Sequence, residues 1–129
     1  ASSMKPGSHG TTFGGNPLAM SVGNAVLDVV LKKNFLNNVQ KNGKYFHSEL
    51  KKIQIRYPKI IKEVRGVGLL IGLKLGVNQL KFIEKLMSNY LLTAKASENV
   101  VRILPPLNVK RNEIDEALAI INKVCKNYK

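Results

Sequence analysis

The chain has 129 residues, which is the length of one domain with a core of moderate size. Its 21 lysines and arginines exceed its 8 acidic residues, but most are lysines at helical spacing with few aromatic neighbours, which argues against a nucleic-acid partner. The single cysteine, Cys125, excludes an internal disulfide and a multi-cysteine metal site, and because no apolar run has transmembrane length we expect a cytoplasmic protein with no metal and no membrane partner.

The first element along the chain is a glycine-rich loop with the sequence GSHGTTFGGNP, residues 7–17. Glycines let backbone N–H groups approach an anion closely, and the hydroxyls of Thr11 and Thr12 are further donors. This composition indicates a loop that binds a phosphate. A flexible linker before a helix has a similar composition, and the lysine of a P-loop is absent, so the spacing alone leaves both interpretations open.

Two helices are expected next, over residues 17–33 and 35–55. Asn16 is a suitable N-cap and Pro17 a suitable first helical residue, so the first helix places its unpaired N–H groups and positive dipole end beside the loop. Apolar residues recur at a helical period in both helices. They are Leu18, Val22, Ala25, Val26, Val29 and Val30 in the first, and Leu36, Val39, Gly43, Phe46, Leu50 and Ile53 in the second.

The remainder of the chain predicts strands that alternate with helices. The expected elements are one strand over 60–75 with a bend at Gly66 and Gly68, a helix over 78–91, a short strand over 100–104 and a helix from about residue 110. Pro105 and Pro106 must end the short strand, because proline cannot donate a hydrogen bond to a sheet. This order predicts an α+β fold whose sheet is mostly antiparallel and covered by helices on one side.

Three runs of residues carry a resemblance to a known family: residues 7–17, the run VRGVGLLIG at 64–72 and the run VRILPPL at 101–107. In this order they resemble the class III aminotransferases, which use pyridoxal 5'-phosphate (PLP), and most of all the acetylornithine branch. The resemblance implies that the chain is the C-terminal part of such an enzyme. Residues 1–33 would be the tail of the large domain, with the cofactor-phosphate loop and an interface helix, and residues 34–129 would be the C-terminal small domain of a fold-type I transferase.

The resemblance also implies three ligand-binding residues. Thr12 would donate a hydrogen bond to the cofactor phosphate in the partner subunit of a homodimer, and Thr11, which stands where a serine is common, would touch the substrate. Arg102 would hold the carboxylate of the amino donor and of 2-oxoglutarate, a task that suits a planar guanidinium. The alternatives are a capping role for Thr12 and a surface position for Arg102. Arg65, which precedes a glycine, more often makes a backbone or interdomain bond than a ligand contact.

No catalytic residue is expected within this chain, because the resemblance implies that the lysine bonded to the cofactor lies upstream of Ala1. We therefore expect that the chain alone neither transaminates nor holds PLP. The function implied for the full-length protein is transfer of an amino group between N-acetylornithine and 2-oxoglutarate, in arginine biosynthesis. Two alternatives stay open: another ω-aminotransferase, specific for ornithine or succinyl-diaminopimelate, and a non-enzymatic basic binding module.

Overall fold

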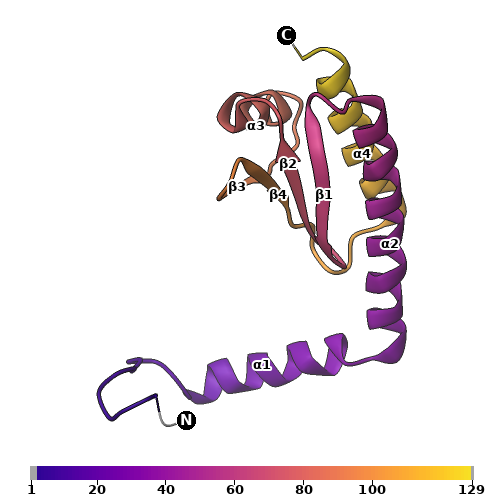
Figure 1. Ribbon diagram of the computed structural model, residues 1–129. Coiled ribbons are helices and arrows are strands. Elements are labelled where there is room, and N and C mark those ends of the chain that lie inside the picture. Colours follow the sequence, from indigo (N-terminus) through magenta and orange to yellow (C-terminus); the bar gives the residue numbers. More distant parts are fainter. Residues whose placement is uncertain (1–2, 129) are drawn as a thin grey trace. The chain divides into compact units, whose positions relative to one another are not determined.

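The computed structural model describes residues 3–128 of the chain (Figure 1). The chain divides into two compact units, Ala1–Leu36 and Asn37–Lys129. The first contains the glycine-rich loop and helix α1, Pro17–Val30, and the second contains a sheet with its helices. The long helix α2, Lys33–Arg56, begins before the boundary and continues through it into the second unit.

Helix α1 begins as predicted, and its apolar stripe is not buried within this unit. Asn16 is the N-cap, and its side-chain oxygen accepts a hydrogen bond of 2.9 Å from the backbone N–H of Ala19. The helix ends at Val30 instead of residue 33, and none of its residues is buried. The periodic apolar side chains from Leu18 to Val30 therefore meet no core within this unit.

Helix α2 supplies one side of the core of the second unit. Its buried residues are Gly43, Phe46, Leu50 and Ile53, all of which the helical period predicts. The two remaining members of the predicted stripe lie near the start of the helix, where Leu36 stays exposed and Val39 is only partly buried. The helix ends at Arg56, ahead of Pro58, because proline cannot continue a helix.

The segment predicted as one bent strand is a β-hairpin. Strands β1, Ile61–Val67, and β2, Leu70–Leu75, pair antiparallel, with Val67 opposite Leu70. The prediction of a single strand is wrong because the two glycines permit a full reversal of the chain. Gly66 and Gly68 have φ angles of 127° and 58°, which residues with side chains rarely adopt. A Cβ atom on Gly66 would also collide with the carbonyl oxygen of Leu70 across the hairpin.

Four further elements complete the second unit. They are helix α3, Gln79–Met87, strand β3, Ala94–Ala96, strand β4, Val100–Ile103, and helix α4, Arg111–Lys126. The four strands form one sheet in the order β1-β2-β4-β3, and every neighbouring pair is antiparallel. The sheet confirms the predicted α+β arrangement. Strand β3 was not predicted, because three residues of the sequence Ala-Lys-Ala carry no recognisable alternation.

The core lies on one face of this sheet. Helices α2 and α4 lie on the same side of the strands in Figure 1, and the strand side chains that face them, such as Leu73 and Val101, are fully buried. Ile114, Leu118, Ile121 and Val124 of α4 are buried, as predicted from their spacing. Cys125 is buried beside them, as its place on an apolar helical face predicts, and burial raises the pKa of its thiol to about 12.

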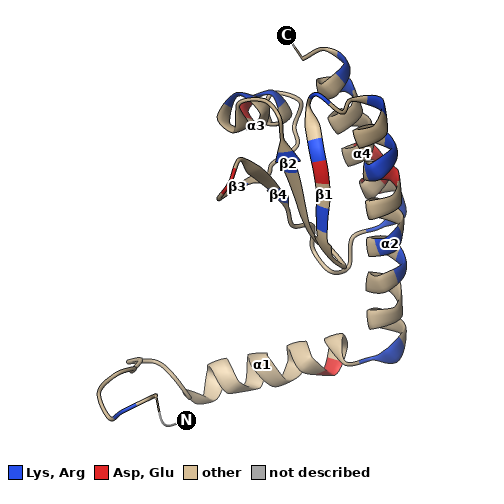
Figure 2. Ribbon diagram, in the orientation of Figure 1, with Lys and Arg blue, Asp and Glu red and all other residues tan. Residues whose placement is uncertain are grey.

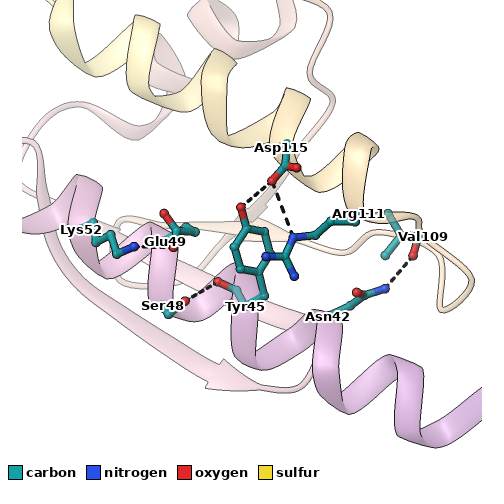
Figure 3. A network of polar contacts seen from close by, with 8 residues as sticks. All are labelled: Asn42, Tyr45, Ser48, Glu49, Lys52, Val109, Arg111 and Asp115. Carbon is teal, nitrogen blue, oxygen red and sulfur yellow. Dashed lines mark hydrogen bonds and ion pairs between the residues drawn. The ribbon is translucent and has the colours of Figure 1, made fainter.

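Polar contacts on the outer surface join α2 to α4 and to the loop before it (Figure 3). The hydroxyl of Tyr45 donates a hydrogen bond to Asp115, which also lies 3.9 Å from Nε of Arg111. The guanidinium of Arg111 lies over the Tyr45 ring, and Asn42 donates a hydrogen bond of 2.8 Å to the carbonyl of Val109. These contacts connect the two helices on the outside of the core.

Charged residues are spread over the second unit and nearly absent from α1. Figure 2 shows Lys and Arg distributed along α2, α3 and α4, whereas α1 is tan except at Asp28. The basic residues of the second unit are therefore distributed over several of its elements.

Candidate carboxylate-binding site

A row of four residues crosses the sheet from edge to edge. Gly72 in β2 lies directly opposite Arg65 in β1 and Arg102 in β4, and Arg102 in turn lies opposite Ala94 in β3. Residues directly opposite one another in antiparallel strands place their side chains on the same face. The two arginines therefore share one face of the sheet, on either side of a residue that has no side chain.

This face is the one that the helices α2 and α4 leave open. Ile71 and Leu73, the neighbours of Gly72 along β2, are buried, so Gly72 belongs to the opposite face by the alternation of a strand. Arg65 and Arg102 are both exposed. A shallow hollow of about 190 Å³ lies here, and both arginines and Gly72 contribute to its wall.

The side chain of Arg102 makes no hydrogen bond or ion pair with any other described residue. Its strand ends at Ile103, and Pro105 and Pro106 follow, as predicted. A guanidinium that is held on a rigid strand, borders a hollow and lacks a counterion is suited to bind a carboxylate bidentately. The structure therefore places this predicted site residue where a ligand could reach it.

Arg65 differs from Arg102 because it has a partner. Its Nη2 atom lies 3.4 Å from a carboxylate oxygen of Glu98, in the turn between β3 and β4. That turn is tightly held: Glu98 and Asn99 have φ angles of 58° and 60°, and the Asn99 side chain donates hydrogen bonds of 2.8 and 2.9 Å to the carbonyls of Leu75 and Val77. Arg65 thus pairs with a side chain in a strand connection of the same unit, whereas its position before a glycine favoured a backbone or interdomain bond.

The glycine-rich loop presents its hydroxyls to the solvent. Thr11 and Thr12 are both exposed, and neither makes a hydrogen bond to another described residue. Ser8 braces the loop instead, since its hydroxyl donates a hydrogen bond of 2.7 Å to the carbonyl of Lys5. The methyl group of Thr11 lies against the α-carbon of Gly14, where any side chain would collide with it. Hydroxyl and backbone donors without partners form the kind of donor set that a phosphate requires.

The predicted site residues fall in different units. Thr11 and Thr12 belong to the first unit and Arg102 to the second, so the structure describes their surroundings separately. Within residues 3–128, no cluster of three or more His, Cys, Asp and Glu side chains is placed to hold a metal ion. In the same part of the chain, no helix is both long and apolar enough to cross a membrane.

A larger hollow of about 610 Å³ lies between α2 and the turn of the β1–β2 hairpin. Lys44, His47 and Lys51 contribute to its wall, and Nε2 of His47 is buried without a partner. Its two lysines are exposed and flexible point charges, whereas the hollow at Gly72 has planar guanidinium groups on neighbouring strands. The smaller hollow is therefore the better candidate for specific carboxylate recognition.

Two residues of the sheet site were not singled out from the sequence for a ligand role. Gly72 gives a weak signal, since it interrupts a run of apolar residues in β2 at a position that faces away from the core. Glu98 gives none, because its approach to Arg65 depends on a pairing between residues 33 positions apart in the sequence.

Comparisons with known proteins agree on one family. The family model described as aminotransferase class III matches residues 1–125. An acetylornithine aminotransferase of Mesorhizobium japonicum is 48% identical over 123 residues, which cover 95% of this chain and 31% of that protein. One of Caldanaerobacter subterraneus is 46% identical over 127 residues, 98% of this chain and 32% of that protein. The chain therefore spans about a third of the length of the relatives it matches.

Solved structures show the same relation. The ornithine aminotransferase of Plasmodium yoelii superimposes with a TM-score of 0.85 at 36% identity, over 98% of this chain and 34% of that one. The acetylornithine aminotransferase of Elizabethkingia anophelis does so with a TM-score of 0.84 at 34% identity, over 97% of this chain and 32% of that one. The predicted resemblance and the α+β fold of the small domain are thereby confirmed, and the chain belongs to the class III aminotransferases.

Proposed function

We propose that this chain is the C-terminal part of a PLP-dependent acetylornithine aminotransferase, and that Arg102 holds the carboxylate of each amino-acid and oxo-acid substrate. The observation that carries the proposal is the unpaired guanidinium of Arg102 on the open face of the sheet, opposite Gly72. The names of the most similar relatives support N-acetylornithine as the amino donor. Arginine biosynthesis and a cytoplasmic homodimer form part of the same proposal.

The glycine-rich loop would supply contacts to the cofactor. PLP, when bound, withdraws electrons from the carbon that bears the substrate's free amino group and so allows this amino group to be transferred. Thr12 would donate a hydrogen bond to the phosphate of PLP, and Thr11 would lie beside the substrate. Both hydroxyls are exposed and make no hydrogen bond to another described residue, which fits a task at an interface with a partner subunit.

The two parts of the chain would belong to different domains of the full-length enzyme. Residues 1–33 would belong to the large domain and its dimer interface, and residues 34–129 would form the C-terminal small domain. The exposed apolar surface of α1 supports this division, because a helix of that composition ordinarily packs against another surface. The lysine that bonds to PLP would lie outside the chain, so the 129-residue chain alone would not transaminate.

The proposal is tested on the product of the complete reading frame that encodes this chain. Glutamate formation from N-acetylornithine and 2-oxoglutarate is measured for the unaltered protein and for the variants Arg102→Gln and Arg102→Lys. Loss of a bidentate carboxylate contact is expected to lower kcat/KM by about 100-fold or more in Arg102→Gln, with partial recovery in Arg102→Lys. Arg111→Gln is the matched control, because Arg111 is an exposed arginine in the contacts between α2 and α4.

The outcomes separate the candidate functions. Activity with N-acetylornithine that depends on Arg102 supports the proposal. Faster turnover of ornithine or succinyl-diaminopimelate would favour the other ω-aminotransferases. A complete reading frame whose product neither changes the absorbance of added PLP nor forms glutamate would support the non-enzymatic basic binding module.

A further inference from the structure

We propose that the hollow between α2 and the turn of the β1–β2 hairpin is a further binding site, which takes the phosphate group of a small phosphate monoester. The ammonium groups of Lys44 and Lys51 bind the phosphate oxygens, and His47 lies between these lysines along the helix. The inference goes beyond the proposed function, because the lining residues of this hollow include only Gly66 of those that line the hollow beside Arg102.

The helical period places the basic residues of this hollow on one side of α2. His47 follows Lys44 by three residues and precedes Lys51 by four, and residues at these spacings are neighbours on the surface of a helix. All three contribute to the wall, and none of the described residues that line the hollow is acidic. The wall therefore presents positive charge to whatever enters.

The two lysines have no counterion within the described part of the chain. Neither Lys44 nor Lys51 forms an ion pair with another described residue. Glu49, the only acidic residue of α2, pairs with Lys52 at a distance of 2.6 Å, and this pair lines a different hollow, next to α4. Lysine binds phosphate as a point charge, and a phosphate monoester at neutral pH carries nearly two negative charges, so two free lysines match it.

Two glycines bring the turn of the hairpin against this side of α2 (Figure 1). A Cβ atom on Gly43 would lie 2.8 Å from the Cα, C and O atoms of Gly68, so a side chain at position 43 would push the helix and the turn apart. Beside this contact, Val67 belongs to the wall and is 84% exposed. The hollow thus offers an apolar surface to the body of a ligand as well as cations to its phosphate.

The size of the hollow and the surroundings of His47 support a ligand larger than inorganic phosphate. The volume of about 610 Å³ lies within the range of about 300–1,000 Å³ that is typical of small-molecule sites. Nε2 of His47 is buried and makes no hydrogen bond with another described residue. A buried nitrogen without a partner is unfavourable, and a ligand that forms a hydrogen bond with the ring removes this cost.

The test uses the 129-residue chain and two matched probes, phenyl phosphate and benzenesulfonate. Both carry a phenyl ring, but at about pH 7.5 the first has nearly two negative charges and the second has one. Binding is followed by NMR through the backbone amide signals of the chain. Phenyl phosphate is expected to shift the signals of Gly66, Val67 and Gly68 with a dissociation constant of about 1 mM, and benzenesulfonate should bind about fivefold more weakly. Inorganic phosphate should also bind more weakly, because it has no apolar part.

Four variants assign the binding to this hollow. Lys44→Gln and Lys51→Gln should each weaken the binding of phenyl phosphate about threefold to fivefold, a change of the size that an exposed charge pair provides. Lys41→Gln is the matched control and should change it by less than about twofold, because it removes the same charge from an exposed position of α2 outside the hollow. Arg102→Gln should leave the shifts at the turn unchanged. Circular dichroism establishes that each variant keeps the fold.

Several results would overturn the inference. These are no binding of phenyl phosphate, equal affinities for phenyl phosphate and either of the other probes, shifts confined to residues outside the turn, or a loss in Lys41→Gln as large as that in Lys44→Gln and Lys51→Gln. The measurement is independent of the test of function, since a full-length protein that does not transaminate leaves these affinities unchanged.

Discussion

Helices α1 and α4 show opposite relations between composition and burial. Helix α1 has a single charged residue, Asp28, among its 14 residues, yet none of them is buried. Helix α4 contains six charged residues among 16, yet buries five side chains against the sheet and α3. An apolar stripe therefore allows a helix to be buried. Whether the helix is buried depends on the presence of a second surface that packs against the stripe.

The exposed side chains of α1 make up a large apolar surface. Leu18, Met20, Val22, Val26, Leu27 and Val29 are each at least 47% exposed. Contiguous apolar surfaces of this kind are typical of interfaces with another chain or domain. In the proposed enzyme this surface would meet the rest of the large domain and the partner subunit.

The strongest test of this difference in burial makes the same substitution in both units. Phe82 of α3 is fully buried, whereas Phe13 of the loop is 79% exposed. Phe82→Ala should lower the free energy of unfolding by about 3–5 kcal/mol, because it leaves a cavity in the core, and Phe13→Ala should change it by less than about 0.5 kcal/mol. Urea unfolding followed by circular dichroism measures both.

A milder substitution at Phe82 provides a measurement in case Phe82→Ala does not fold. Phe82→Leu keeps most of the volume and should cost about 1 kcal/mol. Equal effects of the alanine substitutions at Phe82 and Phe13 would contradict the assignment of the core to the second unit.

A smaller effect is expected at Gln79, the one buried polar side chain within residues 3–128. Gln79 is 7% exposed, and its side-chain N–H groups donate hydrogen bonds to the carbonyls of Ala96 and Val100. Gln79→Met should cost about 1–3 kcal/mol, because it leaves these carbonyls without a donor in the interior. Gln40→Met, at an exposed position of α2, is the matched control. A similar loss in both variants, measured by urea unfolding, would show that the hydrogen bonds are unimportant.

The apolar surface of α1 predicts that the chain associates with itself. Val22 and Val26, which are 55% and 54% exposed, lie one turn apart. Changing both to Asp should raise the dissociation constant of the associated chain about tenfold or more, since two charges would then enter an apolar contact. Light scattering over a range of concentrations measures it. Ile55→Asp, at a 79% exposed position of α2, should have little effect, and an unaltered chain that stays monomeric at high concentration would refute the prediction.

The smallest effect is expected on the outer surface of the second unit. Tyr45→Phe removes the hydroxyl that hydrogen-bonds Asp115, the main cause of the raised pKa of the Tyr45 phenol (Figure 3). Water replaces a hydrogen bond at such an exposed site, so the urea midpoint should stay within the repeatability of the measurement. A shift comparable to that of Gln79→Met would show that the surface contacts between α2 and α4 contribute to stability.

Local signals predicted most of the helices of this fold. The N-cap at Asn16, the periodic apolar residues of α2 and α4, and the proline after α2 each act within a few residues, so the sequence alone located these elements. The hairpin and β3 could not be predicted from local signals alone. Whether Gly66 and Gly68 bend the chain or reverse it depends on the pairing of β1 with β2, and Ala94–Ala96 is a strand only because β4 lies beside it.

The candidate site divides in the same way. The family and the functional candidates Thr11, Thr12 and Arg102 could be predicted from the sequence, because the motifs that carry them are continuous runs of residues. The strand pairing of the tertiary structure, in contrast, places Arg65 and Arg102 on one face of the sheet on either side of Gly72 and brings Glu98 to Arg65. The physical reason is that strand pairing joins residues far apart in the chain through backbone hydrogen bonds, which any sequence can make and which therefore leave little trace in the sequence.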